Sequence, residues 1–461
     1  MTDVRAVARG LATVFLSGEW TRAGITQRVQ TALEQRVKSR AVDLLVGRIL
    51  RACGEQPPPP TLHKLTKLIL SDPVFHKYIA EEDGYPRRLN LAHLPPPVMA
   101  PAPAIPSDWQ LPTILTPGAL ADWLGLSSPE LEWFADCHGR ERQRAREALR
   151  HYRYRWIPKR TGGRRLLEIP KQRLKDLQRT ILQWILGRIE PHAAAHAFRR
   201  GRSIASFAQP HSAKRVVLRI DLRHFFPSVQ PSRIKSLFRT VGYPEAVARL
   251  LCGLCTNSVP DDILGVAEQQ FATNERQPVE RLYAAAHLPQ GAPTSPALAN
   301  LAARRLDGRL SGLATAVGGD YTRYADDLVF SGGRALERCL PRFRTLLLAI
   351  VLDEGFSIRH RKTAVMPAGG RQQVAGIVVN EHPNLNRKEF DRLKAILYNC
   401  AHHGPRSQLT GCLPQPNEPP TEATLEQLRS HLTGKVAFVR MINPAKGERL
   451  SKLLREIDWV G

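Results

Sequence analysis

The sequence predicts an α+β protein with a helical region at each end of the chain. Apolar residues recur every three or four positions in residues 1–92 and again after Arg387, which is the spacing of one helix face. Between these regions, apolar and β-branched runs typical of strands mix with helical patterns without a regular alternation. The composition, 43% hydrophobic and 24% charged, is ordinary for a folded protein and excludes a wholly disordered chain.

The beginning of the chain predicts a separate helical extension. Apolar positions follow helical spacing within residues 4–15 and 41–50. The proline-rich segment 95–106 predicts an extended, semi-rigid linker. We therefore expect a helical N-terminal extension over residues 1–92 and a linker over residues 93–110. The composition of the extension assigns no particular chemistry to it.

The charge balance predicts a polyanionic partner. The chain has 67 Lys and Arg residues against 42 Asp and Glu residues, a formal net charge of +25. Basic proteins bind nucleic acids because each neutralised phosphate releases condensed counterions. A surface that serves only solubility does not require so large an excess of positive charge. Nucleic acid is therefore the expected partner.

Membrane and secreted classes are not expected. The longest apolar stretch, around Leu346–Leu352, is far short of the roughly 18 residues that a spanning helix needs. The segment Met1–Val4 does not look like the start of a signal peptide. Seven cysteines are scattered along the chain, and the one close pair, Cys252 and Cys255, lacks the second pair that would complete a zinc site. Reduced thiols in a cytoplasmic protein are the expectation, with zinc at this pair as the alternative.

A basic hairpin is predicted at residues 151–170. Arginines and aromatics alternate along its first half, a pattern that suits a strand with stacking faces and phosphate contacts. An edge strand with charges facing water explains the same pattern equally well. Thr161–Gly163 is a turn signal, and Arg165–Pro170 returns as the second strand.

Three further segments carry candidate chemistry. Asp326 and Asp327 are flanked by strand-forming residues, which predicts a tight hairpin with two acids at its tip, although an Asp-Asp surface turn is also common. Asp221 ends the β-branched run that begins at Arg215, and a carboxylate there needs a partner. The loop Leu288–Pro296 contains Ser295, which can cap a following helix. Three carboxylates brought together would form an oxygen-only site suited to Mg²⁺.

Together, and in this order, the three segments resemble the palm motifs of reverse transcriptases: a strand acid, an L-P-Q-G-x-P-x-S-P loop and a Y-A-D-D hairpin. Further segments match the same family over roughly residues 150–445. They are Ile157–Pro170, Phe198–Ser203, Gly355–Thr363 and Val374–Asn380. The resemblance implies a right-hand polymerase architecture: N-terminal helices and fingers at 111–214, a palm with an antiparallel sheet at 215–372, and a primer grip with a helical thumb at 373–461.

The resemblance also implies site residues. Asp221, Asp326 and Asp327 would be catalytic and would bind two Mg²⁺ ions. Phe226 matches the position that excludes a ribose 2′-hydroxyl, with an ordinary core phenylalanine as the alternative. The remaining matched positions border the incoming dNTP or its phosphates: Lys159, Arg165, Gln290, Gly291 and Lys362. A solvated lysine at a helix end is the alternative for Lys362.

Within this family the chain looks most like a bacterial retron enzyme. Ala193 and His196 match a retron N-A-x-x-H element, but His192 stands in place of the asparagine, and Ala375 replaces the threonine of a V-T-G element. His192 and His196 have the spacing of two metal ligands on one helix. We expect a structural or RNA-contacting role for them instead of metal binding. Expected RNA contacts are Arg153, Arg155, His196, Arg199 and Arg202.

A retron resemblance implies particular partners and products. The enzyme would bind a structured noncoding RNA, copy part of it into single-stranded DNA from dNTPs, and leave a branched RNA–DNA molecule. It implies antiphage defence, with an effector protein that could dock on the N-terminal extension. The alternatives are a group II intron-like, a diversity-generating or a non-retron defence reverse transcriptase, and a non-catalytic RNA-binding scaffold.

Overall fold

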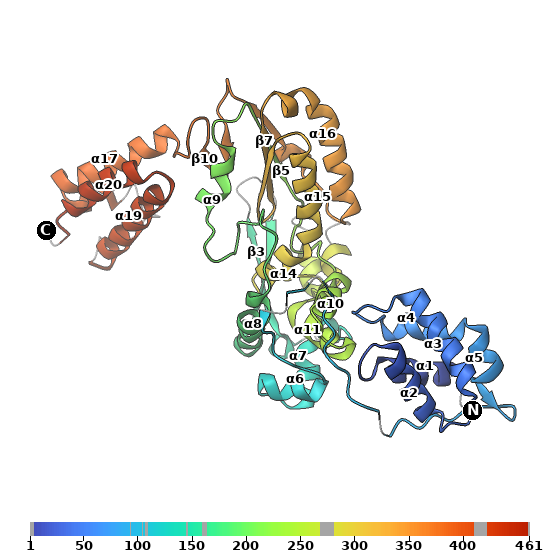
Figure 1. Cartoon of the computed structure of the whole chain (residues 1–461). Helices are drawn as coiled ribbons and strands as arrows, with labels where there is room; N and C mark the ends of the chain where they lie inside the picture. The colour runs from blue at the N-terminus through green and yellow to red at the C-terminus, as the bar shows by residue number, and fades with distance from the viewer. Residues whose placement is uncertain are drawn as a thin grey trace. The chain divides into compact units, whose positions relative to one another are not determined.

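The computed structural model describes residues 4–92, 94–103, 105–106, 109–143, 146–158, 164–267, 281–409 and 422–459. The chain divides into two compact units, the first formed by residues 1–190 and 226–302 and the second by residues 191–225 and 303–461 (Figure 1). Across these described ranges, no helix is both long and apolar enough to cross a membrane.

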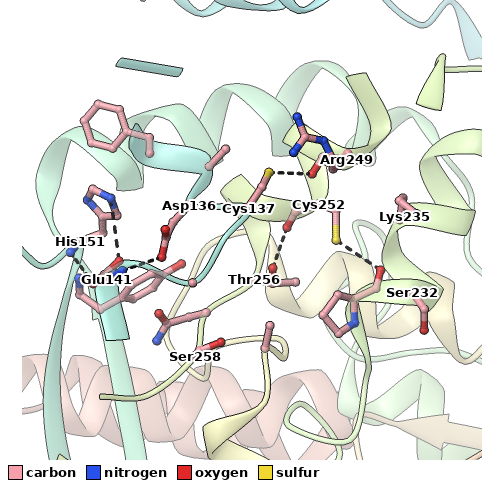
Figure 2. A pocket seen from close by; sticks show the side chains of 18 residues that line it. Asp136, Cys137, Glu141, His151, Ser232, Lys235, Arg249, Cys252, Thr256 and Ser258 are labelled. Carbon is pink, nitrogen blue, oxygen red and sulfur yellow. Dashed lines mark hydrogen bonds and ion pairs between the residues drawn. The ribbon is translucent and has the colours of Figure 1, made fainter. Parts of the chain in front are cut away.

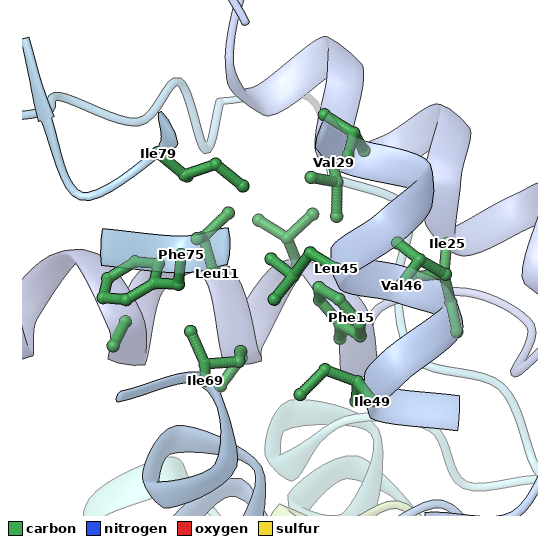
Figure 3. Close-up of a cluster of buried hydrophobic side chains, with 14 of the residues drawn as sticks. Leu11, Phe15, Ile25, Val29, Leu45, Val46, Ile49, Ile69, Phe75 and Ile79 are labelled. Carbon is green, nitrogen blue, oxygen red and sulfur yellow. The ribbon is translucent and has the colours of Figure 1, made fainter. Parts of the chain in front are cut away.

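The N-terminal helices have a hydrophobic core of their own. They are α1 (Val4–Leu16), α2 (Arg22–Ala32), α3 (Ser39–Cys53), α4 (Leu62–Leu70) and α5 (Pro73–Tyr78), followed by the short strands β1 (Glu81–Glu82) and β2 (Tyr85–Pro86). Leu11 and Phe15 of α1 meet Leu45 of α3 and Phe75 of α5, and all four are fully buried (Figure 3). The helical spacing predicted for this region is confirmed because its apolar face is the face that packs.

The remainder of the first unit combines a β-hairpin with short helices. The elements are α6 (Pro117–Leu124), α7 (Ser128–Ala135), β3 (Tyr152–Pro158), β4 (Arg164–Pro170), α8 (Gln172–Trp184), α10 (Pro231–Thr240), α11 (Glu245–Cys255), α12 (Asp261–Ala267) and α14 (Ser295–Ala302). Thr116 caps α6, and Ser127 forms a capping box with Glu130 at the start of α7. The predicted basic hairpin is confirmed by antiparallel pairing from Tyr152 opposite Pro170 to Pro158 opposite Arg164.

A four-stranded antiparallel sheet organises the second unit. Its order is β6 (Asp320–Tyr324), β7 (Asp327–Gly332), β5 (Val216–Asp221) and β8 (Ala364–Pro367). Helices α15 (Arg304–Thr315) and α16 (Arg334–Asp353) run beside the sheet, and the short helix α9 (Ile204–Ala208) also contacts it (Figure 1). The strand predicted to end at Asp221 and the predicted acidic hairpin are both present.

Two sequence predictions were wrong in detail. The β-branched run of residues 373–380 predicts a single strand, but the structure has a tight hairpin of β9 (Gln373–Val374) and β10 (Ile377–Val378) there. Ala375 and Gly376 both have positive φ, +47° and +88°, and two consecutive left-handed residues reverse the chain between paired strands. The segment from Ser295 to Leu310, rich in small residues, predicts a single helix, but the structure interrupts it at Ala303, so α14 and α15 are separate.

The C-terminal part of the second unit is helical, as predicted. It contains α17 (Arg387–His403), α19 (Glu422–Ile442) and α20 (Pro444–Arg455). Their apolar faces bury one cluster that includes Leu397, Leu428, Leu432 and Leu450. Because the apolar residues recur at helical spacing, each helix turns one stripe toward this shared core.

Candidate active site

The two adjacent acids lie where β6 turns into β7. Tyr324 pairs with Asp327, so Ala325 and Asp326 alone form the turn. Ala325 has a φ of +55°, a left-handed conformation that costs energy for a residue with a Cβ. Asp326 and Asp327 are half-buried. The strained turn therefore holds the two carboxyl groups at the end of a rigid hairpin.

Asp221 lies directly opposite Asp327 across the neighbouring strands β5 and β7. Residues paired in this way project from the same face of a sheet, with Cβ atoms about 4.5–5.5 Å apart. The backbone N–H of Leu222, the next residue, donates a 2.8 Å hydrogen bond to the carbonyl oxygen of Asp326. The sheet thus brings together three acids that are widely separated in the sequence.

The electrostatics of Asp327 reflect this crowding. Burial, followed by the charges of Asp326 and Asp221, raises the pKa of Asp327 to about 6, although Arg219 and Lys362 oppose the shift. Among the described residues, no three acidic, imidazole or thiol groups are arranged closely enough to form a ready-made metal site. The three carboxylates are close to one another, but their oxygens do not converge on one point as metal ligands do.

The side chain of Asp221 is paired with two cations instead. Asp221 is buried, and its Oδ2 accepts a 2.7 Å hydrogen bond from Lys362 Nζ. A guanidinium nitrogen of Arg359 lies 3.2 Å from Asp221 Oδ1, and the Arg359 backbone N–H bonds to the Asp221 carbonyl. Lys362 was among the predicted residues, whereas Arg359 was missed. The basic run Arg359–Lys362 was the available signal.

A buried ion pair supports the acidic hairpin from behind. Arg323 of β6 and Asp307 of α15 are both fully buried, and their side chains form two hydrogen bonds of 2.7 Å. Arg323 also donates a 3.2 Å bond to the carbonyl oxygen of Ala325, the strained turn residue. Tyr321 adds a hydrogen bond to Asp307. Sequence reasoning missed this pair because a charge on a half-polar strand usually faces water.

The predicted nucleotide-binding loop belongs to the first unit. Gln290 is half-buried and Gly291 is exposed, and Ser295 fixes the loop by donating a 2.7 Å hydrogen bond to the carbonyl oxygen of Pro289. Gly291 has a φ of +139°, and a Cβ there would lie 2.7 Å from the carbonyl oxygen of Glu168. Only glycine fits this conformation and this close approach to β4.

Comparison with known proteins identifies the family. The model of the family "Reverse transcriptase (RNA-dependent DNA polymerase)" matches residues 157–390, which contain the three acids and the loop. The chain belongs to the reverse transcriptase family. It is of the retron type, because it is 42% identical over 316 residues to the retron Mx65 reverse transcriptase of Myxococcus xanthus and 36% identical over 354 residues to the retron Mx162 enzyme of the same organism.

These matches cover only part of each protein. They span 67% and 74% of this chain, but 65% and 66% of the two Myxococcus proteins. Among solved structures, a foamy viral protease-reverse transcriptase in complex with an RNA/DNA hybrid matches with a TM-score of 0.31 and 13% identity. That match covers 67% of this chain and 31% of the viral one, and it is too weak to compare the folds.

The first strand of the basic hairpin in this retron-type chain separates its arginines from its aromatics. Arg153 and Arg155 are exposed and, because side chains alternate along a strand, share one face of the hairpin with Arg165, which pairs with Ile157. Tyr152 is 2% exposed on the opposite face. Tyr154 and Trp156 pack against a hydrophobic cluster on that opposite face, so the aromatics are packing residues, whereas the arginines are exposed. Lys159 lies outside the described residues.

The other predicted contacts of the reverse transcriptase differ in exposure. Phe226, in the first unit, is half-buried, and in the second unit Arg199 is half-buried and Arg202 is exposed. His196 is buried, its ring Nδ1 lies 2.9 Å from Ser206 Oγ, and burial together with Arg202 and Arg199 lowers its pKa to about 4. These contacts favour the structural role for His196. His192 and His196 do not share a helix.

The close cysteine pair lies on α11. Cys252 lines a cavity of about 360 Å³ bounded by α7, α10 and α11, and its thiol donates to the carbonyl oxygen of Pro231 (Figure 2). Burial raises the pKa of Cys252 to about 12 and raises that of the fully buried Cys255 further. Thiols with raised pKa values are protonated and are poor metal ligands at neutral pH.

Proposed function

We propose that this chain is an RNA-directed DNA polymerase of the retron type. It copies part of a bound, structured noncoding RNA into single-stranded DNA from dNTPs. One observation carries this proposal: Asp221 faces Asp327 across paired strands, beside Asp326, in a chain of net charge +25. Placing carboxylates so close together costs electrostatic free energy, and packing of the sheet does not require it. Such clusters are typical of functional sites.

The same residues fit a pair of Mg²⁺ ions. Asp221, Asp326 and Asp327 supply only carboxylate oxygens, which Mg²⁺ prefers. Burial, and then the charges of the neighbouring acids, raise the pKa of Asp327, and a bound cation would offset both effects. Bound there, two Mg²⁺ ions would promote attack by a primer hydroxyl and neutralise charge on the triphosphate. The three acids would hold the ions, and Lys362, 2.7 Å from Asp221 Oδ2, would supply a positive charge for a phosphate group bound beside them.

The other residues recognise the substrate. Gln290 and Gly291 border the nucleotide and the template base, and Arg165 and Lys159 hold the triphosphate. Phe226 packs under the sugar and excludes a 2′-hydroxyl. The β3–β4 hairpin would then belong to the fingers, the four-stranded sheet to the palm, and the helices α17, α19 and α20 to the thumb.

The RNA would be held through its backbone and shape. Exposed Arg153, Arg155 and Arg202 offer phosphate contacts, with Arg199 beside Arg202. We propose that the product is a branched RNA–DNA molecule and that the enzyme acts in antiphage defence with an effector. Sequencing of nucleic acid that co-purifies with the chain would test this subclass, because an intron or an unbranched product would point to another reverse transcriptase class.

Activity on a primed RNA template with Mg²⁺ and dNTPs tests the polymerase itself. We expect Asp326→Asn to abolish nucleotide incorporation because it removes a ligand charge. Asp320→Asn is the matched control, since Asp320 lies at the start of the same hairpin and pairs with Lys214 at 2.6 Å. Equal incorporation by wild type and Asp326→Asn would refute the assignment of the catalytic acids, whereas an inactive wild type that still binds RNA would point to an RNA-binding scaffold.

A further inference from the structure

The Gln290–Gly291 loop is attached to strand β4 through one fully buried acid. Glu168 has no solvent exposure, and its backbone N–H donates a 3.0 Å hydrogen bond to the carbonyl oxygen of Gln290. In return, the Gln290 backbone N–H lies 3.3 Å from Glu168 Oε2. Both backbone polar groups of Gln290 are thus satisfied by the same residue.

The Glu168 carboxylate is held in turn by two other buried side chains. His287 Nε2 lies 3.1 Å from Oε2, and Asn257 Nδ2 donates a 2.8 Å hydrogen bond to Oε1. The backbones of Asn257 and His287 exchange two hydrogen bonds of 3.0 and 2.9 Å. Asn257 also donates to the hydroxyl of Tyr154 on β3, at 3.1 Å. These hydrogen bonds fix the position of the Glu168 carboxylate.

The contacts of His287 favour its protonated form. Its Nδ1 lies 2.7 Å from the carbonyl oxygen of Ala285, which can only accept, while Nε2 faces the carboxylate of Glu168. Burial lowers the pKa of His287, but the charge and hydrogen bond of Glu168 outweigh it and raise the pKa above its ordinary value. An imidazolium, with a donor at both ring nitrogens, would satisfy the Ala285 carbonyl and an ionised Glu168 carboxylate together.

The buried Glu168–His287 pair adds little to the stability of the fold, so we look for its role in positioning the loop. Buried ion pairs contribute little more to stability than well-packed apolar side chains of the same size. The pair does fix the loop at a defined distance from the hairpin, and the close approach of Gly291 to the Glu168 carbonyl shows how tightly the two are joined. A loop that must orient a nucleotide needs such fixed support.

We propose that Glu168 is the positioning residue of the nucleotide-binding loop, fixing the Gln290 backbone to the fingers hairpin without touching the substrate. This inference rests on the proposed polymerase function and deepens it, because it assigns the precision of nucleotide binding to a buried acid in the hairpin. Neither Glu168 nor His287 nor Asn257 belongs to the acidic metal-binding site.

Glu168→Gln in the full-length protein tests the proposal. A glutamine keeps the volume and an acceptor for Asn257, but its amide nitrogen cannot accept from the Gln290 N–H. We expect the KM for the complementary dNTP on a primed RNA template to rise roughly tenfold, the effect of losing a hydrogen bond to a charged group, while kcat changes little. Hydrogen–deuterium exchange of the peptide that contains Gln290 should become faster.

Leu166→Ala is the matched control. Leu166 is fully buried on the same strand and packs against Tyr283 and Val259, so its truncation weakens the hairpin without removing a bond to the loop. We expect it to lower the melting temperature while leaving the KM and the exchange of the Gln290 peptide close to wild type. If Leu166→Ala raises the KM as much as Glu168→Gln does, Glu168 has only a structural role.

Two further outcomes separate this inference from the proposed function. An active wild type with an unchanged KM and unchanged exchange in Glu168→Gln would overturn the positioning role and leave the polymerase intact. An inactive wild type would overturn the proposed polymerase function. Faster exchange in the variant would then still support the role of Glu168 in holding the Gln290 loop. If Glu168→Gln does not fold, Asn257→Ser should give the same KM-against-kcat split with a smaller amplitude, because it removes the hydrogen bonds to Glu168 Oε1 and to Tyr154 but leaves the contacts of Oε2 in place.

Discussion

Lys362 Nζ lies 2.7 Å from Asp221 Oδ2, so a cation already occupies the carboxylate that is proposed to hold Mg²⁺. Arg359, 3.2 Å from the other oxygen, completes the pairing. The two basic groups compensate the charge of a buried acid that would otherwise be costly. A metal ion has to compete with them, which makes their removal informative.

Lys362→Met should separate stability from metal binding. Without the ammonium group, Arg359 is the one cation left of the two that pair with Asp221, so the melting temperature of the metal-free protein should fall. The rise in melting temperature on adding Mg²⁺ should be larger than in wild type, because less competition remains. Thermal melts over a Mg²⁺ titration measure both effects. Lys388→Met, at an exposed position of α17, is the control, and an equal Mg²⁺ response in both variants would contradict the competition.

Phe226→Ala should weaken discrimination between dNTPs and rNTPs. Removing the ring opens space for a 2′-hydroxyl, and we expect the ratio of kcat/KM values to fall by roughly 10- to 100-fold, the range found for single groups in a pocket. Single-nucleotide incorporation with matched dNTP and rNTP gives the ratio. Phe225→Leu, at the neighbouring buried position, should lower stability without changing the sugar preference. Unchanged discrimination in Phe226→Ala would return Phe226 to the hydrophobic core.

Asp307→Asn should destabilise the second unit strongly. It leaves Arg323 charged, fully buried and without its carboxylate, a change that typically costs about 3–5 kcal/mol. Chemical denaturation measures the loss in the free energy of unfolding. Glu337→Gln removes the partner of Arg215 in a largely exposed ion pair, where less than about 1 kcal/mol is expected. Similar losses in the two variants would show that burial of the Arg323 pair has no special cost.

His211 predicts loss of stability in acid. Its ring is fully buried between Ser331 Oγ and Thr322 Oγ1, at 2.7 Å each, and Thr322 donates onward to the carbonyl oxygen of Phe207. The neutral ring therefore donates from Nε2 and accepts at Nδ1. Burial lowers the pKa of His211 from 6.5 to about 3; Asp320 opposes this shift, and Lys214 and His196 add to it.

The sign of the pH effect follows from proton binding. Below pH 6.5 the unfolded chain takes up a proton that the folded His211 refuses, so the folded state loses about 1.4 kcal/mol per pH unit until the folded pKa is reached. His211→Gln should flatten the slope of stability against pH between 6.5 and 4 by about one proton. His360→Gln, at an exposed position, is the control, and equal changes of slope in the two variants would contradict the prediction.

Arg153 and Arg155 should contribute to RNA affinity without sequence preference. Replacing both with glutamine should weaken binding and reduce the slope of log K against log salt by about one per lost phosphate contact. Filter binding with the co-purified RNA at several salt concentrations gives the slope. Arg179→Gln is the control, because Arg179 is exposed on α8 but pairs with Asp176. A slope unchanged in the double variant would place the RNA elsewhere.

The sequence alone predicted much of the local structure. Helical spacing located the N- and C-terminal helices because their stability comes from burying one apolar stripe, which is written directly in the residue order. The basic hairpin, the strand ending at Asp221 and the acidic hairpin followed from alternation and turn residues in the same way. The double reversal at Ala375 and Gly376 was missed because alanine carries no signal for a left-handed turn.

Only the tertiary structure decided which residues meet. The pairing of Asp221 with Asp327 depends on the register of β5 and β7, and the engagement of Asp221 by Lys362 and Arg359 depends on where the chain returns beside β5. The Glu168–His287–Asn257 group and the Arg323–Asp307 pair were equally invisible in the sequence. A local pattern records whether a side chain is apolar or charged, but the partner that makes a buried charge tolerable comes from a distant segment, and folding alone brings the two together.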